Sequence, residues 1–420
     1  MRQQSLLFSS ATLVAIVVVG LIASYVYQRR RNQRERAVEL AAAEATDDDP
    51  AFAPDAVRER AAQLFVDVHD ARNRGDRSDL AALLTPGLFA EERRQLDERT
   101  RVGWRRHIEV LGLDRVEYLG LVNRDGEGED RVTVRIRASV RDQMVETRPR
   151  PLPPRSPTSI ESVMAFLGEY ESEQTADDLS TEIAEFWTLA KHADGSDWVV
   201  ASIESDVEGR HALAAEIVAS PSGDVQRMAD ASLLEVAALD KLPAAFRASE
   251  VVDVDYAGDA DTAALDLSLV DGRWAPAVLD AAVRRAVAAW AAAVDGGGRD
   301  LLDVATAEAA QALLHPGDPT RRTRLVIRGP RVRQLTISAL DPTANPPRMT
   351  VEFKVRGRRY VQDRNTGAML SGIKSFAVPT TERWTLALSG PDERPWQIVD
   401  TETSAHRILH WIVRVQNDVR

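Results

Sequence analysis

The sequence predicts an α+β protein in which two tandem units follow one N-terminal transmembrane helix. An uncharged, apolar stretch fills residues 6–27, and a pattern of helices followed by alternating strands then occurs twice. The two copies end in related segments, EFWTLAKHADGSDWVVASIES at 185–205 and ERWTLALSGPDERPWQIVDTET at 382–403. A chain of 420 residues is also too long for a single typical core.

Composition excludes several classes of function. The formal net charge of −12 argues against a nucleic-acid-binding protein, which needs a basic face to displace phosphate counterions. The chain has no cysteine, so it has no disulfide framework, no thiolate zinc site and no cysteine nucleophile.

Residues 1–28 are expected to form a membrane anchor. The 22 residues of 6–27 would span roughly 33 Å as a helix, which is enough for the hydrocarbon core of a bilayer. A cleaved signal peptide would instead carry its positive charge before the apolar core. Here only Arg2 precedes the stretch. Five arginines follow it, which places the body in the cytoplasm by the positive-inside rule: Arg29, Arg30, Arg31, Arg34 and Arg36. A body outside the membrane remains the alternative.

Residues 29–54 are predicted to be a juxtamembrane linker, first basic and then acidic. The segment from Ala37 to Pro54 is rich in alanine, continues into EATDDDP and ends in proline-punctuated sequence, which is typical of a solvated spacer. Ordered structure is therefore expected to begin near Asp55.

The first unit is assigned to residues 55–218. Apolar residues at helical spacing predict a helix over 55–74 that ends at Gly75, and Thr85 with Pro86 predicts the capped start of a second helix. The segment DRVTVRIRASV alternates apolar and polar residues as a half-buried strand does. A proline-rich insertion, RPRPLPPRSP, and an acidic helix, IESVMAFLGEYESEQTADDL, follow, and VEGRHALAAEIVAS is expected to be the last helix.

The second unit is assigned to residues 276–420, after a connecting segment at 219–275. A helix is predicted over 276–294, MTVEFKV alternates as a strand, and SAHRILHWIVRVQ is expected to be a C-terminal helix. Because this order repeats that of the first unit, the chain is interpreted as a tandem duplication.

Four tryptophans are expected to form the cores of the two units. Trp187 and Trp198 share their strand faces with Leu189 and Val200, and Trp384 and Trp396 are placed in the same way. Paired strands would bring these indoles together against the opening helix, where they would contribute packing; stacking on a ligand is the alternative.

Three motifs resemble a known family. They are the E-x-W-T ending, the helix pair DLAALLTPGLFAEE and the hairpin YVQDRNTGAMLSG at 360–372. They are similar to bacterial proteins that resemble the C-terminal domain of the forty-four-kilodalton subunit of the mitochondrial inner-membrane translocase (Tim), within the nuclear transport factor two-like superfamily. The resemblance implies two cone-shaped units, each with helices packed on a curved antiparallel sheet. It also implies a peripheral membrane scaffold linked to protein translocation.

The sequence contains no catalytic, metal or cofactor motif that we recognise. The histidines are scattered, and NRDGEGED lacks the spacing of a calcium loop, so no metal and no cofactor are expected. The cone fold also supports enzymes, and Tyr118, Asp142, Glu185 and Glu382 are the groups that would serve one. We expect ion pairs at the two glutamates and therefore no catalysis.

Each unit carries an arginine cluster at a similar position, between its second helix and its first long strand. A solvated helix face is the alternative reading, but the resemblance favours contact with anionic phospholipid or an acidic protein partner. The candidate residues are Arg99, Arg101, Arg105 and Arg106 in the first unit and Arg321, Arg322, Arg324 and Arg328 in the second.

Two functions follow. The first is a non-enzymatic, membrane-anchored scaffold or binding module that recruits a protein partner or anionic lipid at the cytoplasmic face of the cell membrane. The alternative is a cone-fold protein that binds a small molecule or lipid, including an isomerase-like enzyme.

Overall fold

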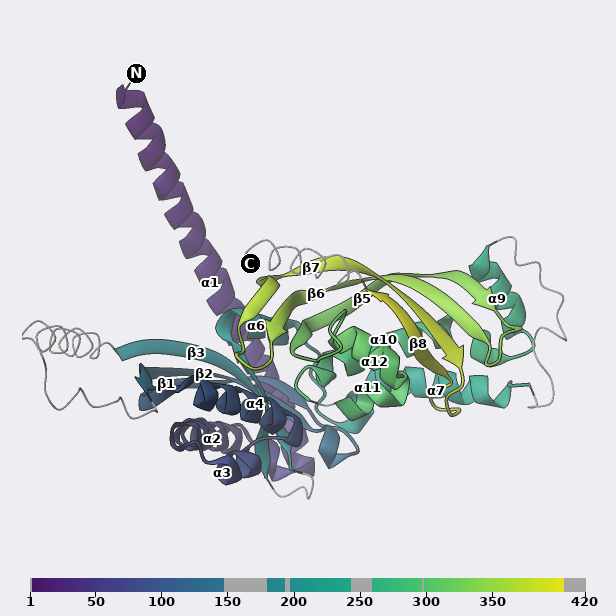
Figure 1. The fold of residues 1–420 in the computed structure, drawn as a ribbon, viewed down its shortest axis with the longest axis horizontal. Coiled ribbons are helices and arrows are strands. Elements are labelled where there is room, and N and C mark those ends of the chain that lie inside the picture. The colour runs from purple at the N-terminus through teal and green to yellow at the C-terminus, as the bar shows by residue number, and fades with distance from the viewer. Residues whose placement is uncertain (1, 147–179, 193–196, 243–258, 297, 404–420) are drawn as a thin grey trace, which may run out of the picture.

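The computed structural model describes residues 2–146, 180–192, 197–242, 259–296 and 298–403, with the side chains of 2–14, 16, 127, 146 and 403 outside this description. It contains two four-stranded antiparallel sheets, each with helices packed on one face (Figure 1). The prediction of an α+β chain with two units is therefore confirmed. The proline-rich insertion, the acidic helix after it and the C-terminal helix lie outside the described residues.

The first unit packs its helices on the sheet β1-β2-β3-β4. Its elements are α2 (Pro54–Arg74), α3 (Arg77–Leu83), α4 (Pro86–Val102), β1 (Trp104–Val122), β2 (Arg131–Glu146), β3 (Ser180–Lys191) and β4 (Trp198–Ser205). The helix expected over VEGRHALAAEIVAS is reduced to two short turns, α6 (Asp206–Gly209) and the 3₁₀ helix at Arg210–Ala214.

Helix α2 forms as its apolar spacing predicts. Leu64, Phe65 and Val68 lie on its buried face, and Gly75 ends it in the left-handed conformation (φ 70°). Helix α4 begins at Pro86 behind Thr85 as predicted, but the Thr85 side chain makes no capping hydrogen bond. Its backbone N–H instead donates to the Val200 carbonyl at 2.8 Å, which ties α4 to the sheet.

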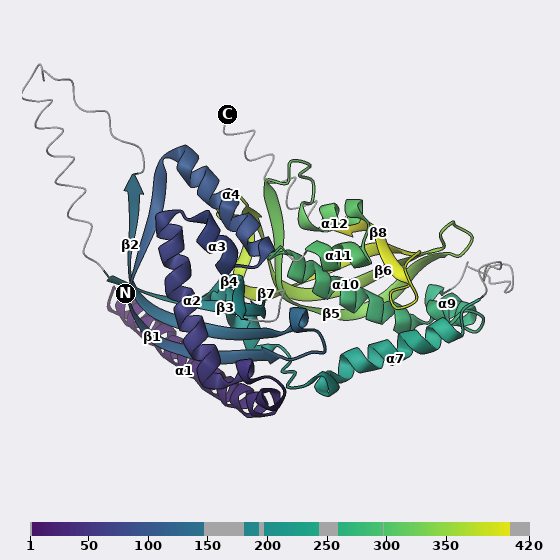
Figure 2. The same ribbon diagram turned by 90° about the horizontal axis from the view of Figure 1, so that it is seen from below.

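The second unit repeats this plan in the sheet β5-β6-β7-β8. Its elements are α10 (Pro276–Ala293), α11 (Gly298–Val304), α12 (Ala307–Leu314), β5 (Thr323–Asp341), β6 (Arg348–Asp363), β7 (Met369–Leu388) and β8 (Trp396–Thr403). The connecting segment contributes α7 (Val225–Leu239) and α9 (Ala260–Ser268), which pack on the second core (Figure 2).

Equivalent contacts in the two cores support the duplication. Trp187 packs 5.2 Å from Phe65, and its counterpart Trp384 packs 6.1 Å from Trp290, between ring centroids. The indole N–H of Trp198 donates to a backbone carbonyl before α2, and that of Trp396 does the same before α10. All four tryptophans of the hairpins are at most 3% exposed, so the prediction of core packing is confirmed.

Helix α1 (Arg2–Asp48) corrects the prediction of a solvated spacer. It continues without interruption to Asp48, through most of the segment expected to be a linker, and its last part lies against the first unit (Figures 1 and 2). Val38, Ala42 and Ala45 are fully buried in the core of that unit. The alanine-rich composition that suggested a spacer therefore marks a helix face that packs closely.

Among the described side chains, no helix is both long enough and apolar enough to cross a membrane. The stretch predicted to span, 6–27, lies partly outside them, because its first nine residues and residue 16 are not included.

Candidate functional site

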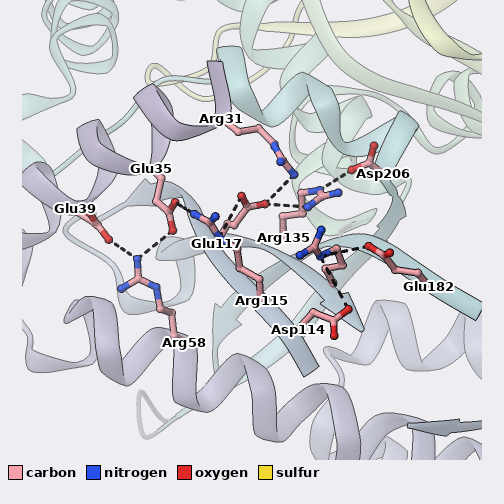
Figure 3. Close-up of polar contacts among 11 residues, drawn as sticks. Arg31, Glu35, Glu39, Arg58, Asp114, Arg115, Glu117, Arg135, Glu182 and Asp206 are labelled. Carbon is pink, nitrogen blue, oxygen red and sulfur yellow. Dashed lines mark hydrogen bonds and ion pairs between the residues drawn. The ribbon is translucent and has the colours of Figure 1, made fainter. Parts of the chain in front are cut away.

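The docked part of α1 is held by charged side chains on the outer face of the first sheet (Figure 3). Glu117 of β1 is 1% exposed and accepts hydrogen bonds from Arg31 of α1 at 3.0 Å and Arg135 of β2 at 2.9 Å. Arg135 also donates to Asp206 at 2.5 Å. Burial alone would lower the pKa of Arg135, but its hydrogen bonds to Asp206 and Glu117 raise it. The Arg135 guanidinium therefore has two carboxylate partners, and losing one member of the cluster would leave a buried group unpaired.

A second set of contacts lies one turn further along α1. Glu35 accepts hydrogen bonds from Arg115 of β1 at 2.7 Å and from Arg58 of α2 at 3.2 Å (Figure 3). Arg34 donates to the backbone carbonyl of Leu119 at 2.8 Å. Two of the five arginines that follow the apolar stretch, Arg31 and Arg34, thus bind the body of the protein. Side chains of α1 both donate hydrogen bonds to the first unit and accept them from it. Because the helix is also continuous, α1 is fixed relative to the first unit.

The N-terminal half of α1 projects away from both units (Figure 1). In its described part, large apolar side chains point into the surroundings and are 54–65% exposed: Val17, Val19, Leu21, Ile22 and Tyr25. A row of apolar side chains this long on a projecting helix is the kind of surface that a membrane or a partner covers. At the junction of the two halves, the Tyr27 hydroxyl donates to Asp206 at 3.1 Å.

The two units meet at a buried group of charges around α6. Glu208 is 4% exposed and accepts hydrogen bonds from Arg328 of β5 at 3.2 Å and from the Tyr360 hydroxyl of β6. Glu204, on β4, accepts from His211 at 2.7 Å. Burial alone would raise the pKa of the Glu204 carboxyl, but Arg328 and His211 lower it to about 2. The contacts of Glu208, together with the 3.6 Å approach of Arg328 to Glu204, join the first unit to the second sheet.

A second contact between the units involves Glu91 of α4. Its carboxylate pairs with Arg364 in the turn after β6 and lies 3.5 Å from Arg324 of β5. Nearby, the backbones of Gly87 and Gly296 touch so closely that a Cβ on either would come within 2.5 Å of the other backbone. Only glycine fits at this point.

The predicted arginines of the second unit divide into two pairs. Arg324 and Arg328 are each 8% exposed, so in this structure they bind the first unit and are not accessible to a lipid surface. Burial would lower the pKa of Arg328, but the carboxylates of Asp295 and Glu204 raise it. Arg321 and Arg322 are exposed, and they bond to Gln311 at 2.7 Å and Asp363 at 3.2 Å.

The predicted arginines of the first unit lie at the end of α4 and the start of β1. Arg101 is exposed and binds Glu98 with two hydrogen bonds, and Arg106 binds Asp142 in the same way. Arg99 is half-buried and bonds to Gln95 at 3.3 Å, and Arg105 is also half-buried. The structure therefore places exposed arginines at the surface of both units. Arg101, Arg106, Arg321 and Arg322 each bind a partner within their own unit.

The four groups considered for catalysis do not converge. Asp142 pairs with Arg106, and Glu185 accepts the indole N–H of Trp187 at 2.9 Å. Tyr118 is fully buried in the first unit and burial raises its pKa. Glu382, fully buried in the second unit, pairs with Arg359, and burial raises the pKa of its carboxyl. The ion pair predicted at Glu382 is confirmed.

Two further observations concern buried histidine and metal ligands. His69 of α2 is 1% exposed, and burial followed by the charges of Arg72 and Arg106 lowers its pKa to about 3. Within the described ranges, no three His, Asp or Glu side chains gather as metal ligands.

Several residues of the contacts were not identified from the sequence. They are Glu91, Glu204, Glu208 and Tyr360, and they occur in segments that look like ordinary helix faces and strands. No sequence spacing relates them to their partners. In the bonds Arg328–Glu208, Tyr360–Glu208 and Arg364–Glu91, the two residues are 120 or more positions apart.

Part of the chain matches a known protein family. No curated protein matches the chain. Among solved structures, an NTF2-like protein involved in plasmid conjugation matches with 11% identity over 83% of this chain and 93% of that chain, at a TM-score of 0.18, which is too low to support an argument. The family model of the Tim44-like domain matches residues 38–149. The match begins at Val38, the first apolar residue among the described side chains of α1 that is buried in the first unit. Residues 38–149 therefore carry a Tim44-like domain.

Proposed function

We propose that this chain is a non-enzymatic scaffold that is anchored in the cell membrane by α1 and holds its two units at the cytoplasmic face, where they recruit a protein partner. The observation that carries the proposal is the continuity of α1. One end is fixed to the first unit by Glu117 and Glu35, and the other projects with exposed apolar side chains. A helix that is rigid across this junction sets the height and orientation of the units above the bilayer.

The charge distribution supports the cytoplasmic orientation. Arg29, Arg30 and Arg36 follow the apolar stretch and remain exposed, in addition to the two arginines that dock on the body. Lys and Arg next to a span favour the cytoplasmic side. The exposed arginines at the surface of each unit, such as Arg101 and Arg322, would add a weak attraction to anionic lipid, on the order of 1 kcal/mol for each near the bilayer.

Membrane retention of the full chain tests this proposal. Val18 and Ile22 lie four residues apart on one face of α1, and an Asp at each would cost roughly 3 kcal/mol in the middle of a span. We expect the wild-type chain to stay in the membrane pellet after alkaline extraction and the variant V18D/I22D to appear in the supernatant. Leu40→Asp is the matched control, because Leu40 is 78% exposed on the docked part of the same helix.

Two results would count against the anchor. One is a wild-type chain that is extracted as easily as V18D/I22D; the other is a Leu40→Asp control that is lost from the membrane to the same extent. Protease added to intact cells then tests orientation: a cytoplasmic body stays uncut until the cells are lysed.

A further inference from the structure

The outer face of the second sheet contains a basic hollow, which we define by its lining residues Arg333, Gln334, Lys354, Val355, Arg356 and Pro379. The hollow has a volume of about 500 Å³ and is open to the surroundings. It forms where β5 departs from regular pairing with β6 between Arg333 and Thr336, and Gln334 adopts a left-handed conformation there (φ 50°). The charged residues Arg333, Lys354 and Arg356 are exposed, whereas the Val355 side chain is buried and faces the core.

The charges of the hollow repel one another in the free protein. Arg333 lies directly across from Lys354 in the antiparallel pair, and Arg356 is the next residue on the same side of β6. Like charges in directly opposed positions are destabilising. Within the part of the chain that the structure describes, none of the three makes an ion pair, although Glu352 is two residues before Lys354 on the same face. Among the described residues, no carboxylate is paired with the cations of the hollow.

The first sheet has cations at the positions equivalent to Arg333 and Lys354, but there carboxylates neutralise them. Val134 pairs with Trp187 as Val351 pairs with Trp384, so the third residue after each valine, Arg137 or Lys354, occupies the same position. Across from these positions are Arg115 in the first unit and Arg333 in the second. By the same register, Glu182 of β3 corresponds to Pro379 of β7.

Carboxylates neutralise these positions in the first unit (Figure 3). Arg137 lies 3.3 Å from Glu182 and 4.0 Å from Asp114. Arg115 lies 2.7 Å from Glu35, which is supplied by α1 as it docks on the outside of the sheet. In the second unit, proline replaces one of these acids, and none of the described helices supplies another. The second sheet thus keeps the cations at these positions, and among the described residues it lacks the carboxylates that pair with them in the first unit.

We propose that the basic hollow binds the carboxylates of an acidic segment of a partner protein. The inference rests on the proposed scaffold function and names the chemistry of the partner. A carboxylate-bearing segment is favoured because carboxylates fill the equivalent place in the first unit, and one of them, Glu35, arrives on a helix from outside the sheet. Binding removes the repulsion between Arg333 and Lys354, which gives an acidic segment an advantage that a neutral one lacks.

The test uses the full chain in a mild detergent and a fluorescent hexaglutamate peptide as the probe, with binding followed by anisotropy at low salt. The variant R333Q/K354Q/R356Q should bind the peptide at least tenfold more weakly, because each exposed charge contributes up to about fivefold. The matched control R74Q/R77Q/R101Q removes three exposed arginines from the first unit, each paired with a carboxylate, and should bind within twofold of wild type. The melting temperature of R333Q/K354Q/R356Q should not fall below that of the wild type, since the substitutions relieve repulsion.

Three results would overturn the inference. The first is equal binding by R333Q/K354Q/R356Q and wild type, and the second is an equal loss in the control, which would mean general charge attraction. The third is displacement of the peptide by glycerol phosphate or inorganic phosphate at concentrations below that of free glutamate, which would assign the hollow to a lipid headgroup or to phosphate. Peptide binding in detergent does not depend on the anchor, so failure here is distinct from failure of membrane retention.

Discussion

A single buried histidine should make the first unit sensitive to acid. His69 lies on α2 with its ring centroid 4.6 Å from that of Phe65 and 6.2 Å from that of Trp187, and neither of its ring nitrogens has a hydrogen-bond partner among the described residues. An imidazolium in this place would be a buried, unpaired charge beside Arg72 and Arg106. The folded state therefore holds the ring neutral, with its pKa lowered to about 3.

The size of the effect follows from the difference between the folded and unfolded states. The ring of the unfolded chain titrates near pH 6.5, so below that pH the unfolded state binds a proton that the folded state does not accept until about pH 3. The free energy of unfolding consequently falls as the pH falls through this window. Between pH 7 and pH 5 the loss amounts to about 2 kcal/mol. That is a large fraction of the stability of a typical domain.

His69→Leu removes the titrating group and keeps an apolar side chain in the core. Its free energy of unfolding, measured by urea denaturation with hydrogen exchange of the α2 amides as the local reporter, should change by about 2 kcal/mol less than that of the wild type between pH 7 and pH 5. His107→Leu, at a half-exposed histidine of β1, is the control and should keep the wild-type dependence. Parallel pH dependence in the wild type and His69→Leu would refute the reasoning.

Two further predictions concern packing. Trp187→Ala or Trp384→Ala should each lower the free energy of unfolding by roughly 3–5 kcal/mol, because each indole is fully buried; a variant that keeps its melting temperature would show that the indole is not a core residue. Gly87→Ala should loosen the contact between the units, seen as a larger radius of gyration in small-angle X-ray scattering, whereas Gly298→Ala, where a Cβ meets nothing within 4 Å, should leave it unchanged. Equal radii for the two variants would contradict the close contact between Gly87 and Gly296.

Much of the fold follows from local sequence signals. Leu64, Phe65 and Val68 recur at helical spacing and do form the buried face of α2. Val351, Phe353 and Val355 alternate and do face the second core. Such periodicities indicate which face of a helix or strand is buried, and they can be read from residues that are close together in the chain. The end of α1 shows the limit of this reasoning, because Val38, Ala42 and Ala45 looked like part of a solvated spacer until the first unit was seen to cover them.

The candidate sites divide along the same line. By itself the sequence determined that arginines cluster at a similar place in both units, that α1 begins with an apolar stretch, and that a unit is duplicated. Only the tertiary structure decided which charges are available. Arg324 and Arg328 are buried against Glu91 and Glu208, whereas Arg333, whose sequence neighbours gave no signal, stands at an open hollow. The physical reason is that the fold decides which distant carboxylate lies beside an arginine and how much solvent reaches it. These two factors determine whether its charge is available, and the neighbouring residues in the chain indicate neither.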